Sequence, residues 1–335
     1  MIIVAILVTG GAGYIGSHTA LELIESNIAK EGEVIIVDNM QKGHAQAVKG
    51  GKLYPCDLRD VDNLEKVFAE NEIDAVIHFA ADSLVGESMT MPFKYYGNNF
   101  ISTLRLLETM NKFGCKKIVF SSTAATYGEP VNTPILESDP TIPTNVYGET
   151  KLAVEKLLRW TEEAYGIKYV SLRYFNAAGA HKSGEIGEDH APETHLIPLV
   201  LQVALGKREH IGIFGDDYPT PDGTCIRDYI HVTDLASAHI AALKRLNDIN
   251  KSGIYNLGSG NGFSVREVID VCREVTGHKI PEVTTPRRAG DPAILVASNE
   301  RASADLGFKM RYPTLQDIVA TAWGFHKKFP NGYEG

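Results

Sequence analysis

A glycine-rich segment near the start of the chain constrains its fold more than any other feature. Residues 9–16 read Thr-Gly-Gly-Ala-Gly-Tyr-Ile-Gly, and they follow the apolar run Ile2–Val8 and lead into a helical pattern. Glycines at 10, 13 and 16 permit a sharp turn, close approach of the backbone to a pyrophosphate, and tight packing of a helix on a sheet. The helix N-terminus would offer free N–H groups and a positive dipole end to that anion. The segment therefore predicts a dinucleotide-binding turn, and no Gly-Lys-Ser/Thr follows to make it a Walker A loop.

An acidic residue after the second apolar run supports this interpretation. The glycine spacing is GxxGxxG, which by itself also fits a turn that binds no ligand. Asp38, however, directly follows the run Val34–Val37 and lies 22 residues beyond Gly16. A carboxylate there can accept hydrogen bonds from the adenosine ribose, and its charge would repel a 2′-phosphate. The predicted cofactor is therefore NAD rather than NADP.

Short apolar runs alternate with amphipathic stretches through the first half of the chain. This alternation is typical of βαβ units, so we predict an α/β fold with a doubly wound parallel sheet, the Rossmann arrangement. The predicted strands are Ile2–Val8, Val34–Val37, Ala75–Phe79, Lys117–Phe120 and Tyr169–Leu172. The helical patterns cover Leu64–Ala69, Phe93–Phe113, Tyr147–Tyr165, Leu196–Leu205, Thr233–Leu246, Ser264–Thr276 and Thr314–Lys327.

The pattern over 147–165 is amphipathic. It places Leu152, Leu157 and Leu158 on one side and Glu155, Lys156 and Arg159 on the other. From about residue 177 the composition of the sequence changes, because Gly, Pro, His and Asp are frequent in the segments 177–193 and 215–223. We interpret this change as the start of a smaller, loop-rich, ligand-binding portion.

Composition excludes several classes of function. Of the 335 residues, 44% are hydrophobic and 22% charged, as in globular proteins, and the net charge of −9 argues against a broad nucleic-acid or anionic-membrane surface. The four cysteines contain no close pair, so we expect neither a disulfide framework nor a metal site. The apolar start lacks a basic region and a cleavage site, and no run is long enough to span a bilayer. We therefore expect a cytoplasmic protein without membrane partners.

A second motif suggests proton transfer. Tyr147-Gly148-Glu149-Thr150-Lys151 opens a helical pattern, which places Tyr147 and Lys151 one turn apart on one face. To act as a base near neutrality, a phenol must lower its pKa by about 3, or about 4 kcal/mol of preferential phenolate stabilisation. The Lys151 ammonium supplies part of this, and the positive nicotinamide ring would supply more. Ser121, Ser122 and Thr123, at the end of a predicted strand, offer hydroxyls to the reacting oxygen.

These motifs together resemble a known family. The stretches are LVTGGAGYIGSH (7–18), GESMTMPFKYYGNN (86–99), FSSTAATYGEP (120–130), YGETK (147–151), LRYFNAAGA (172–180) and RRAGDPA (287–293), with others between about residues 2 and 330. The chain is similar to the extended short-chain dehydrogenases/reductases, and within them to the enzymes that epimerise UDP-galactose and UDP-glucose at C4. The resemblance implies oxidation at C4 by tightly bound NAD, rotation of the 4-keto sugar, and re-reduction. It also implies an NAD-binding domain over 1–176, to which the chain returns around 228–258, and a mainly UDP-sugar-binding domain over 177–335.

The resemblance implies a role for each matching residue. Tyr147 would be the catalytic base, with Lys151 and Thr123 as its catalytic partners. Cofactor-binding residues would be Gly10, Gly11, Gly13, Tyr14, Ile15, Gly16, Asp38, Asn39, Asp57, Leu58, Phe79, Ala80, Ala81, Ser83, Asn98, Ser121, Tyr147, Lys151 and Phe175. Substrate-binding residues would be Thr123, Tyr147, Asn176, His195, Leu196, Arg227, Arg288, Asp291 and Leu295.

The chain also departs from the family pattern. Ser83 stands where some members carry lysine, and His195 where some carry asparagine. The segment between Asp38 and Asp57 is short, which affects the adenosine contacts. An arginine alone would be interpreted as part of a surface ion pair, and Asp228 beside Arg227 and Asp291 near Arg288 keep that interpretation open. We interpret His190 and the tyrosine pair 95–96 as structural.

Three other functions were weighed against 4-epimerisation of UDP-galactose. A 4,6-dehydratase needs an Asp-Glu pair after the strand-end threonine, and this chain has Ala124-Ala125, which cannot transfer a proton. Epimerisation of a uronate, a pentose or an N-acetylhexosamine stays open, because it would differ mainly in the shape of the pocket. A non-catalytic NAD-binding regulator would have no need of the Tyr/Lys/Thr set.

Two further expectations come from the resemblance. Related folds form a homodimer through helices that correspond here to 93–113 and 147–165, and Leu104, Leu107 and Leu158 would contribute to it or pack on the sheet instead. The residue four after the ribose-binding aspartate borders the sugar's 2-position, where tyrosine crowds out an N-acetyl group. Leu295 occupies that position here and should leave room for one, although His195 fills part of the same cavity.

Overall fold

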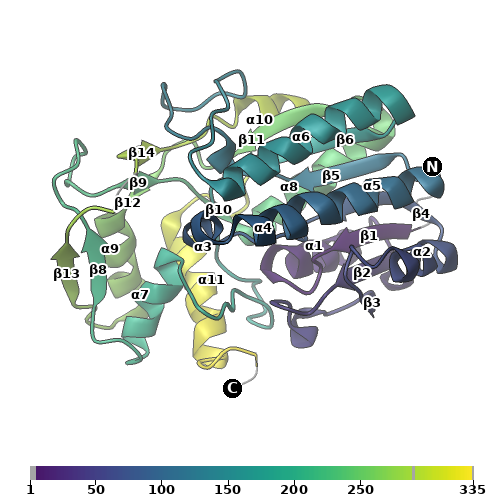
Figure 1. The fold of residues 1–335 in the computed structure, drawn as a ribbon. Helices are drawn as coiled ribbons and strands as arrows, with labels where there is room; N and C mark the ends of the chain where they lie inside the picture. The colour runs from purple at the N-terminus through teal and green to yellow at the C-terminus, as the bar shows by residue number, and fades with distance from the viewer. Residues whose placement is uncertain (1–4, 289–290, 334–335) are drawn as a thin grey trace.

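A central parallel sheet organises the chain (Figure 1). The computed structural model describes residues 5–288 and 291–333. Seven strands lie in the order β11-β6-β5-β4-β1-β2-β3, and every neighbouring pair is parallel. Their bounds are β1 (Ala5–Thr9), β2 (Val34–Asp38), β3 (Lys52–Pro55), β4 (Ile73–His78), β5 (Lys117–Ser121), β6 (Lys168–Tyr174) and β11 (Gly253–Leu257).

All five predicted strands are present, and within the described residues their ends coincide with the predicted ones or differ by one or two residues. Residues 2–4 of the first predicted run lie outside the described residues. The edge strands β3 and β11 were not predicted. Strand β3 has exposed residues at both ends, and β11 is buried only over its last three residues, so neither shows a continuous apolar run.

Helices cover both faces of this sheet, which confirms the doubly wound architecture. In β1, Ile6 and Val8 pack with α1 and α8 on one face, whereas Ala5 and Leu7 pack with α2, α5 and α6 on the other. This alternation follows from the two-residue period of a strand. The helices are α1 (Tyr14–Glu25), α2 (Val61–Glu70), α5 (Ser102–Lys112), α6 (Val146–Tyr165) and α8 (Val232–Asp248), and α10 (Glu300–Leu306) packs beside α8.

The predicted helix over 93–113 is continuous but not uniformly α-helical. It comprises α4 (Pro92–Tyr95), the π-helical turn η3 (Tyr96–Ile101) and α5, and it follows α3 (Val85–Thr90). Pro92 occupies the first helical position, where its missing N–H costs nothing. Turns of π-helix often mark functional sites, and this one carries Asn98 and Asn99.

Glu155 does not share the exposure of Lys156 and Arg159, with which the sequence pattern groups it. Glu155 of α6 is buried, and Arg173 of β6 donates to both its carboxylate oxygens, at 2.9 Å and 2.5 Å. Ser122 donates to the same carboxylate at 2.5 Å, and Arg173 also donates to the Tyr127 hydroxyl at 2.9 Å. Burial opposes the charge of Arg173, but Glu155 raises the pKa of that guanidinium above its ordinary value. Helical periodicity cannot anticipate such a partner, because it comes from another strand.

A smaller lobe has its own apolar core, at the left of Figure 1. This core lies between α7 (Leu196–Ala204), α9 (Val265–Thr276) and α11 (Leu315–Lys328), and the two-stranded sheet of β8 (Ile211–Phe214) and β13 (Glu282–Thr285) packs against it. A three-stranded sheet of β9 (Ile226–Arg227), β12 (Phe263–Ser264) and β14 (Ile294–Leu295) adjoins it. The chain passes between lobes through the parallel pair β7 (Asn176–Ala178) and β10 (Tyr229–His231).

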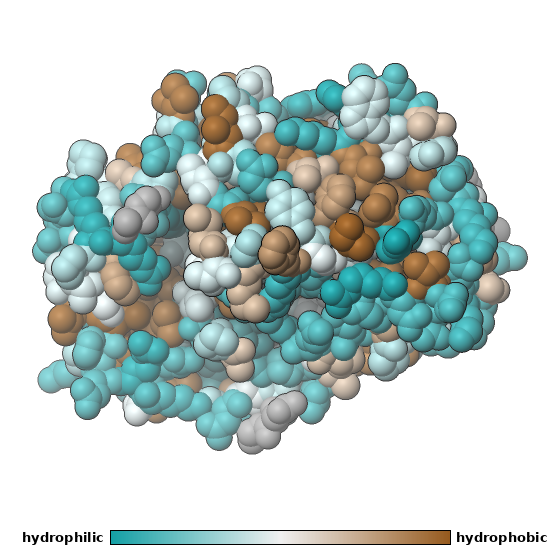
Figure 2. Space-filling view, in the orientation of Figure 1, coloured by the Kyte–Doolittle hydropathy of each residue, from teal (hydrophilic) through white to brown (hydrophobic). Residues whose placement is uncertain are grey.

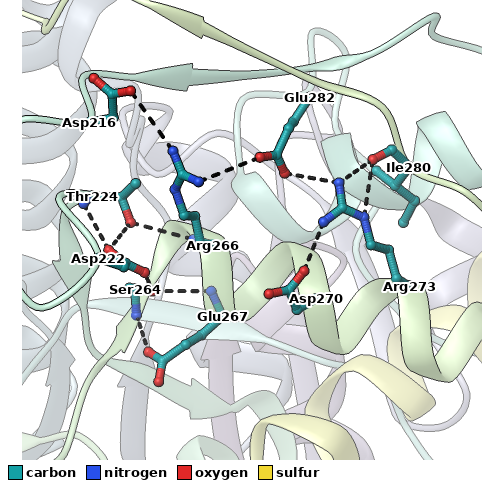
Figure 3. A network of polar contacts seen from close by, with 10 residues as sticks. All are labelled: Asp216, Asp222, Thr224, Ser264, Arg266, Glu267, Asp270, Arg273, Ile280 and Glu282. Atoms are coloured by element: carbon teal, nitrogen blue, oxygen red, sulfur yellow. Dashed lines mark hydrogen bonds and ion pairs between the residues drawn. The ribbon is translucent and has the colours of Figure 1, made fainter.

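Polar contacts fix the start of α9 within the smaller lobe (Figure 3). Ser264 and Glu267 form a reciprocal capping box, with distances of 3.1 and 2.7 Å. Asp222 accepts hydrogen bonds from Ser264 and from Thr224, which ties the loop before β9 to this helix. Arg273 then joins α9 to β13 through Glu282 at 2.9 Å. The loop, the helix and the sheet edge are thereby held as one unit.

The remaining short elements connect these layers. They are η1 (Glu31–Glu33), η2 (Ala45–Ala47) and η4 (Ala124–Thr126). Within the described ranges 5–288 and 291–333, no helix has both the length and the apolar character needed to cross a membrane.

The buried Glu155–Arg173 pair should dominate the stability of the α6–β6 contact. Glu155→Gln leaves Arg173 buried without a counter-charge, so the free energy of unfolding should fall by about 3–5 kcal/mol in urea denaturation. The control is Glu108→Gln, which breaks the exposed pair with Arg105 and should cost less than about 1 kcal/mol. Equal losses in the two variants would contradict the assignment.

Candidate active site

The glycine turn joins β1 to α1. Gly10 has φ +69°, and its N–H donates to the Val37 carbonyl oxygen at 2.7 Å, while the Gly13 N–H donates to the Gly10 carbonyl oxygen at 3.2 Å. Gly13 is the N-cap of α1, and no side chain caps this end. The N–H groups of the first helical turn are therefore available to an anionic ligand.

The turn is packed too closely for any residue but glycine at two positions. A methyl group on Gly16 would lie 2.1 Å from the Gly10 carbonyl oxygen, and one on Gly10 would lie 2.7 Å from the Ala80 nitrogen. The second contact brings the loop after β4, Phe79–Ala81, directly against the turn. The observed cradle therefore fits the pyrophosphate of a dinucleotide, whose phosphates need close approach of the backbone.

Asp38 lies at the end of β2 with its carboxylate held in place. It accepts hydrogen bonds from the Ala12 N–H at 3.0 Å and the Met40 N–H at 2.9 Å, and burial raises its pKa. A methyl group on Gly43 would lie 2.8 Å from this carboxylate, so the loop after β2 folds closely over it. Asn39 follows directly on the same loop. This placement suits recognition of a ribose beside the glycine turn.

The predicted adenine-flanking residues lie beyond β3. Asp57 is paired with Arg59, whose guanidinium lowers the pKa of the Asp57 carboxyl, and Leu58 is buried. The ion pair with Arg59 holds the Asp57 carboxylate within the loop that follows β3.

Sequence reasoning missed Asp82, the buried residue beside Ser83, whereas Ser83 itself is exposed. Asp82 accepts a hydrogen bond from Asn98 at 3.0 Å and lies 3.6 Å from the Lys42 ammonium and 3.9 Å from that of Lys94. The Lys42–Asp82 pair links the loop after β2 to the loop after β4. The available signal was a carboxylate immediately after the strand-end segment Phe-Ala-Ala, where parallel sheets bind ligands.

The structure brings Tyr147, Lys151 and Thr123 together. Asn145 caps α6 by accepting from the Gly148 N–H at 2.8 Å, which starts the helix so that Tyr147 and Lys151 share a face. The Lys151 nitrogen lies 6.0 Å from the centre of the Tyr147 ring and donates to the Ser121 carbonyl oxygen at 2.9 Å. Thr123 lies just past β5, near enough to the Tyr147 side chain to lower the pKa of its phenol.

Without a bound ligand, burial determines the protonation states of Tyr147 and Lys151. It lowers the pKa of Lys151 to about 7, against the opposing charge of Glu155. It also raises the pKa of Tyr147, and the hydrogen bond from Thr123 only partly offsets this. The phenol is therefore protonated at neutral pH in the absence of a ligand, and a cationic ligand beside it would add to the charge of Lys151 in favouring the phenolate.

The remaining predicted cofactor residues line the same edge of the sheet. Gly11 packs on Ile36, the Tyr14 hydroxyl donates to the Gly179 carbonyl oxygen at 2.6 Å, and Ser121 hydrogen-bonds Tyr174. Ile15 and Phe79 pack against the core of the sheet.

One expected pairing in the substrate region is wrong. Asp228 does not pair with Arg227; it turns inward and accepts from the backbone of Ser259 at 2.6 Å and of Ala297 at 3.1 Å. Arg227 instead lies 3.3 Å from Asp291, which was expected beside Arg288. Sequence neighbours on a strand point to opposite faces, which explains why Arg227 and Asp228 part.

The other predicted substrate residues surround this pair. Asn176 donates to the Asp228 carbonyl oxygen at 2.9 Å. Arg288 is exposed, and its guanidinium lies 3.8 Å from the centre of the Phe214 ring. Leu295 and Phe175 pack against a small cluster that contains Ala124, the residue after Thr123. His195 is the N-cap of α7, and the partly buried Leu196 is its first residue.

A polar cluster beside His195 was not predicted. The His195 Nδ1 lies 2.5 Å from a Glu188 oxygen, and His190 and Glu193 complete the group. Burial tends to lower the pKa of both imidazoles, but the carboxylates prevail, raising the pKa of His190 to about 10 and also that of His195.

Comparisons with known proteins agree with this geometry. The family model described as the NAD dependent epimerase/dehydratase family matches residues 6–258. The UDP-glucose 4-epimerase of Halalkalibacterium halodurans is 62% identical over 330 residues, covering 98% of this chain and 97% of that protein. A crystal structure of a UDP-glucose 4-epimerase superposes with a TM-score of 0.96 at 57% identity, covering 99% of this chain and all of the other. The Bifidobacterium longum UDP-glucose 4-epimerase in complex with NAD⁺ and UDP gives 0.91 at 45% identity, covering 98% and 100%.

Gly16→Ala should lose the dinucleotide, because the added methyl group overlaps the Gly10 carbonyl and must open the turn. Nucleotide released from denatured protein after dialysis measures this, and we expect at least a tenfold decrease. Gly32→Ala, where the methyl group meets no atom within 4 Å, is the matched control and should retain the cofactor. Full retention in Gly16→Ala would show that the turn does not hold the pyrophosphate.

Proposed function

This chain belongs to the NAD dependent epimerase/dehydratase family, and on that premise we propose that it interconverts UDP-galactose and UDP-glucose by inverting C4. The observation that carries the proposal is the Tyr147, Lys151 and Thr123 set beside a glycine turn that fits NAD. The likeness to UDP-glucose 4-epimerases over nearly the whole chain supports the same reaction. The protein is thus an isomerase that depends on NAD.

The reaction assigns one role to each catalytic side chain. Bound NAD supplies a hydride acceptor and, later in the cycle, a hydride donor. Tyr147 takes the proton from the sugar 4-hydroxyl, and Thr123 hydrogen-bonds the same oxygen. Lys151 would favour the phenolate by its charge and would hold the nicotinamide ribose of the bound cofactor. After the 4-keto sugar has rotated in the site, Tyr147 returns its proton to the 4-oxygen as C4 is reduced on the opposite face.

Turning the sugar requires a fixed pivot and a mobile ring. Arg227, Arg288 and Asn176 would hold the diphosphate, and Asp291 the uridine ribose, so that only the hexose moves. Leu196 and His195 would line the same region from the start of α7. The smaller lobe, from residue 177 onward, therefore anchors the nucleotide, whereas residues 1–176 bind NAD, with the chain returning around 228–258.

The protons of the reaction pass through one tyrosine, and this argues against dehydration. Ala124 and Ala125 directly follow Thr123 in η4, where a dehydratase would need an acid and a base. A second candidate function, 4-epimerisation of an N-acetylated UDP-hexose, is favoured by one observation: Leu295 packs beside Ala124 and Phe175 and presents no hydroxyl there.

Tyr147→Phe should reduce kcat by about 10²–10⁴-fold, since it removes the proton acceptor and keeps the ring. The cofactor content should be unchanged. Turnover of UDP-galactose without added reductant, together with extracted NAD, measures both. Tyr165→Phe, at the exposed end of the same helix, is the control and should leave kcat unchanged. Near-normal turnover in Tyr147→Phe would refute the assignment.

Leu295→Tyr should narrow the range of substrates. We expect UDP-N-acetylgalactosamine and UDP-N-acetylglucosamine to be turned over more weakly than the parent sugars. Tyrosine should lower kcat/KM for the N-acetylated pair about 10–200-fold and spare the other pair, because it fills the space beside the 2-position. Leu295→Met keeps the volume and should behave as the parent. If the parent has no N-acetyl activity, or tyrosine leaves it intact, Leu295 does not set the boundary.

We also propose a homodimer, formed mainly through exposed apolar residues of the helices over 93–113 and 147–165 and of the segment before them. Leu107 and Leu158 are buried in the core of the sheet, so they are not available to a partner. Apolar side chains are instead exposed along α3 to η3 and on α6, which pack together (Figure 2). They are Met89, Met91, Phe93, Tyr96, Ile101, Trp160 and Tyr165. A contiguous apolar surface of this kind is typical of an isologous interface.

Phe93→Glu should dissociate the proposed dimer, because it places a charge where a 92% exposed aromatic ring would be covered by the partner. Analytical ultracentrifugation at micromolar concentration should show twice 36.6 kDa for the parent and the monomer mass for the variant. Val131→Glu changes another residue that is 80% exposed and should leave the dimer intact. A monomeric parent would contradict the proposal.

The place of action is proposed from the thiols. Cys56, Cys115, Cys225 and Cys272 are all free and buried. Four free thiols fit the reducing conditions of the cytoplasm, so we propose that the protein acts there. UDP-sugars are its expected partners.

A further inference from the structure

We propose that Glu188, His190, Glu193 and His195, here called the 188–195 cluster, bind a divalent transition-metal ion such as Zn²⁺. The four side chains come from eight consecutive residues between β7 and α7, in the pattern Glu-x-His-x-x-Glu-x-His. Each offers one donor atom, and all four atoms lie within 4.8 Å of one another. The cluster adjoins the proposed site, because His195 was assigned to the substrate region and the His190 ring lies 6.3 Å from that of Tyr14, but the proposal concerns binding of an ion and assigns it no step in the sugar chemistry.

The spacing of the donor atoms matches a tetrahedral site. Zinc binds imidazole nitrogen at about 2.0–2.1 Å and carboxylate oxygen at about 2.0–2.2 Å, which separates neighbouring donors by about 3.3–3.5 Å. The His190 Nδ1 lies 3.3 Å from Glu188 Oε1 and 3.7 Å from Glu193 Oε2. The 2.5 Å contact between His195 Nδ1 and Glu188 Oε1 is too short, and it must open by about 1 Å to admit an ion.

The charge of the cluster also suits a dication. Two buried carboxylates carry two negative charges, which need two positive charges beside them. Protons on the two imidazoles can supply these charges, and so can one divalent ion bound by neutral imidazoles. Binding therefore releases protons and leaves the net charge of the cluster unchanged.

The carboxylates are fixed before any ion arrives. The side chains of Glu188 and Glu193 are only 4% and 6% exposed. One Glu193 oxygen accepts from the N–H groups of Thr194 and His195 at 2.7 and 2.8 Å, which leaves the second oxygen for the ion. The side chain of His195 is 45% exposed and provides the path of entry. Such preorganisation lowers the cost of binding.

An ion here would brace the segment that leads into α7. His195 is the N-cap of that helix, so coordination through its Nδ1 would join the helix start to Glu188. The other ring nitrogen, Nε2, would then carry the proton and remain a donor. Asp189 lies outside this arrangement, because it accepts from the Tyr333 N–H at 2.9 Å.

Calorimetric titration of the tag-free, chelator-treated holoenzyme with ZnCl₂ tests the proposal. We expect one zinc ion per chain and a rise in Tm on binding, since an ion that binds only the folded state stabilises it. His190→Asn and Glu193→Gln should each weaken binding at least tenfold and abolish the rise in Tm. His210→Asn, an exposed histidine before β8, should bind as the parent does.

Co²⁺ as a second probe keeps the test independent of the variants. Co²⁺ in the parent should give the strong visible absorption of tetrahedral coordination, without the thiolate charge-transfer band that a cysteine ligand would add. Failure of the parent to bind Zn²⁺, equal affinity in His190→Asn and the parent, or a thiolate band would each overturn the proposal. Because none of these readouts depends on turnover, loss of the proposed epimerase function would not affect the result.

Discussion

The contact between the glycine turn and the loop after β4 is the constraint on which the rest of the site depends. Backbone atoms approach so closely at Gly10 and Gly16 that a single methyl group would separate β1, α1 and β4. The uncapped start of α1 lies at the same end of the sheet as Asp38, at the end of β2, and Asp82, in the loop after β4. Binding of the cofactor would thus depend mainly on the close packing of the backbone, and the side chains would orient the bound cofactor.

Near Tyr147, the chain buries several groups whose ionised forms are destabilised by desolvation. Burial lowers the pKa of Lys151 to about 7 and raises that of Tyr147, so neither side chain is ionised cheaply without a ligand. One helical turn further along, Glu155 is fully paired with Arg173 and holds α6 on β6. The pair therefore fixes α6 on β6. A cationic cofactor would add the positive charge that favours the Tyr147 phenolate, as expected of an enzyme that transfers a hydride to NAD and back.

The substrate lobe is assembled from segments that are distant in the chain. Asp228 accepts hydrogen bonds from Ser259 and Ala297, and this joins the strand that carries Arg227 to the one that carries Leu295. Arg227 reaches Asp291 across the same small sheet. If the 4-keto sugar rotates during the reaction, the nucleotide must stay firmly bound. Otherwise the 4-keto intermediate would dissociate before it is reduced.

The sequence by itself determined the doubly wound sheet, the dinucleotide turn and the Tyr147–Lys151 pair. Each of these depends on neighbours along the chain: glycines at short spacing, apolar runs of strand length, and two residues one helical turn apart. The partners of the buried charges were decided only by the tertiary structure. Glu155 meets Arg173 across 18 residues, Arg227 meets Asp291 across 64, and Asp82 meets Lys42 from another loop. Such pairs form where packing leaves two desolvated groups side by side, and periodicity along the chain carries no record of which strand or loop will lie opposite.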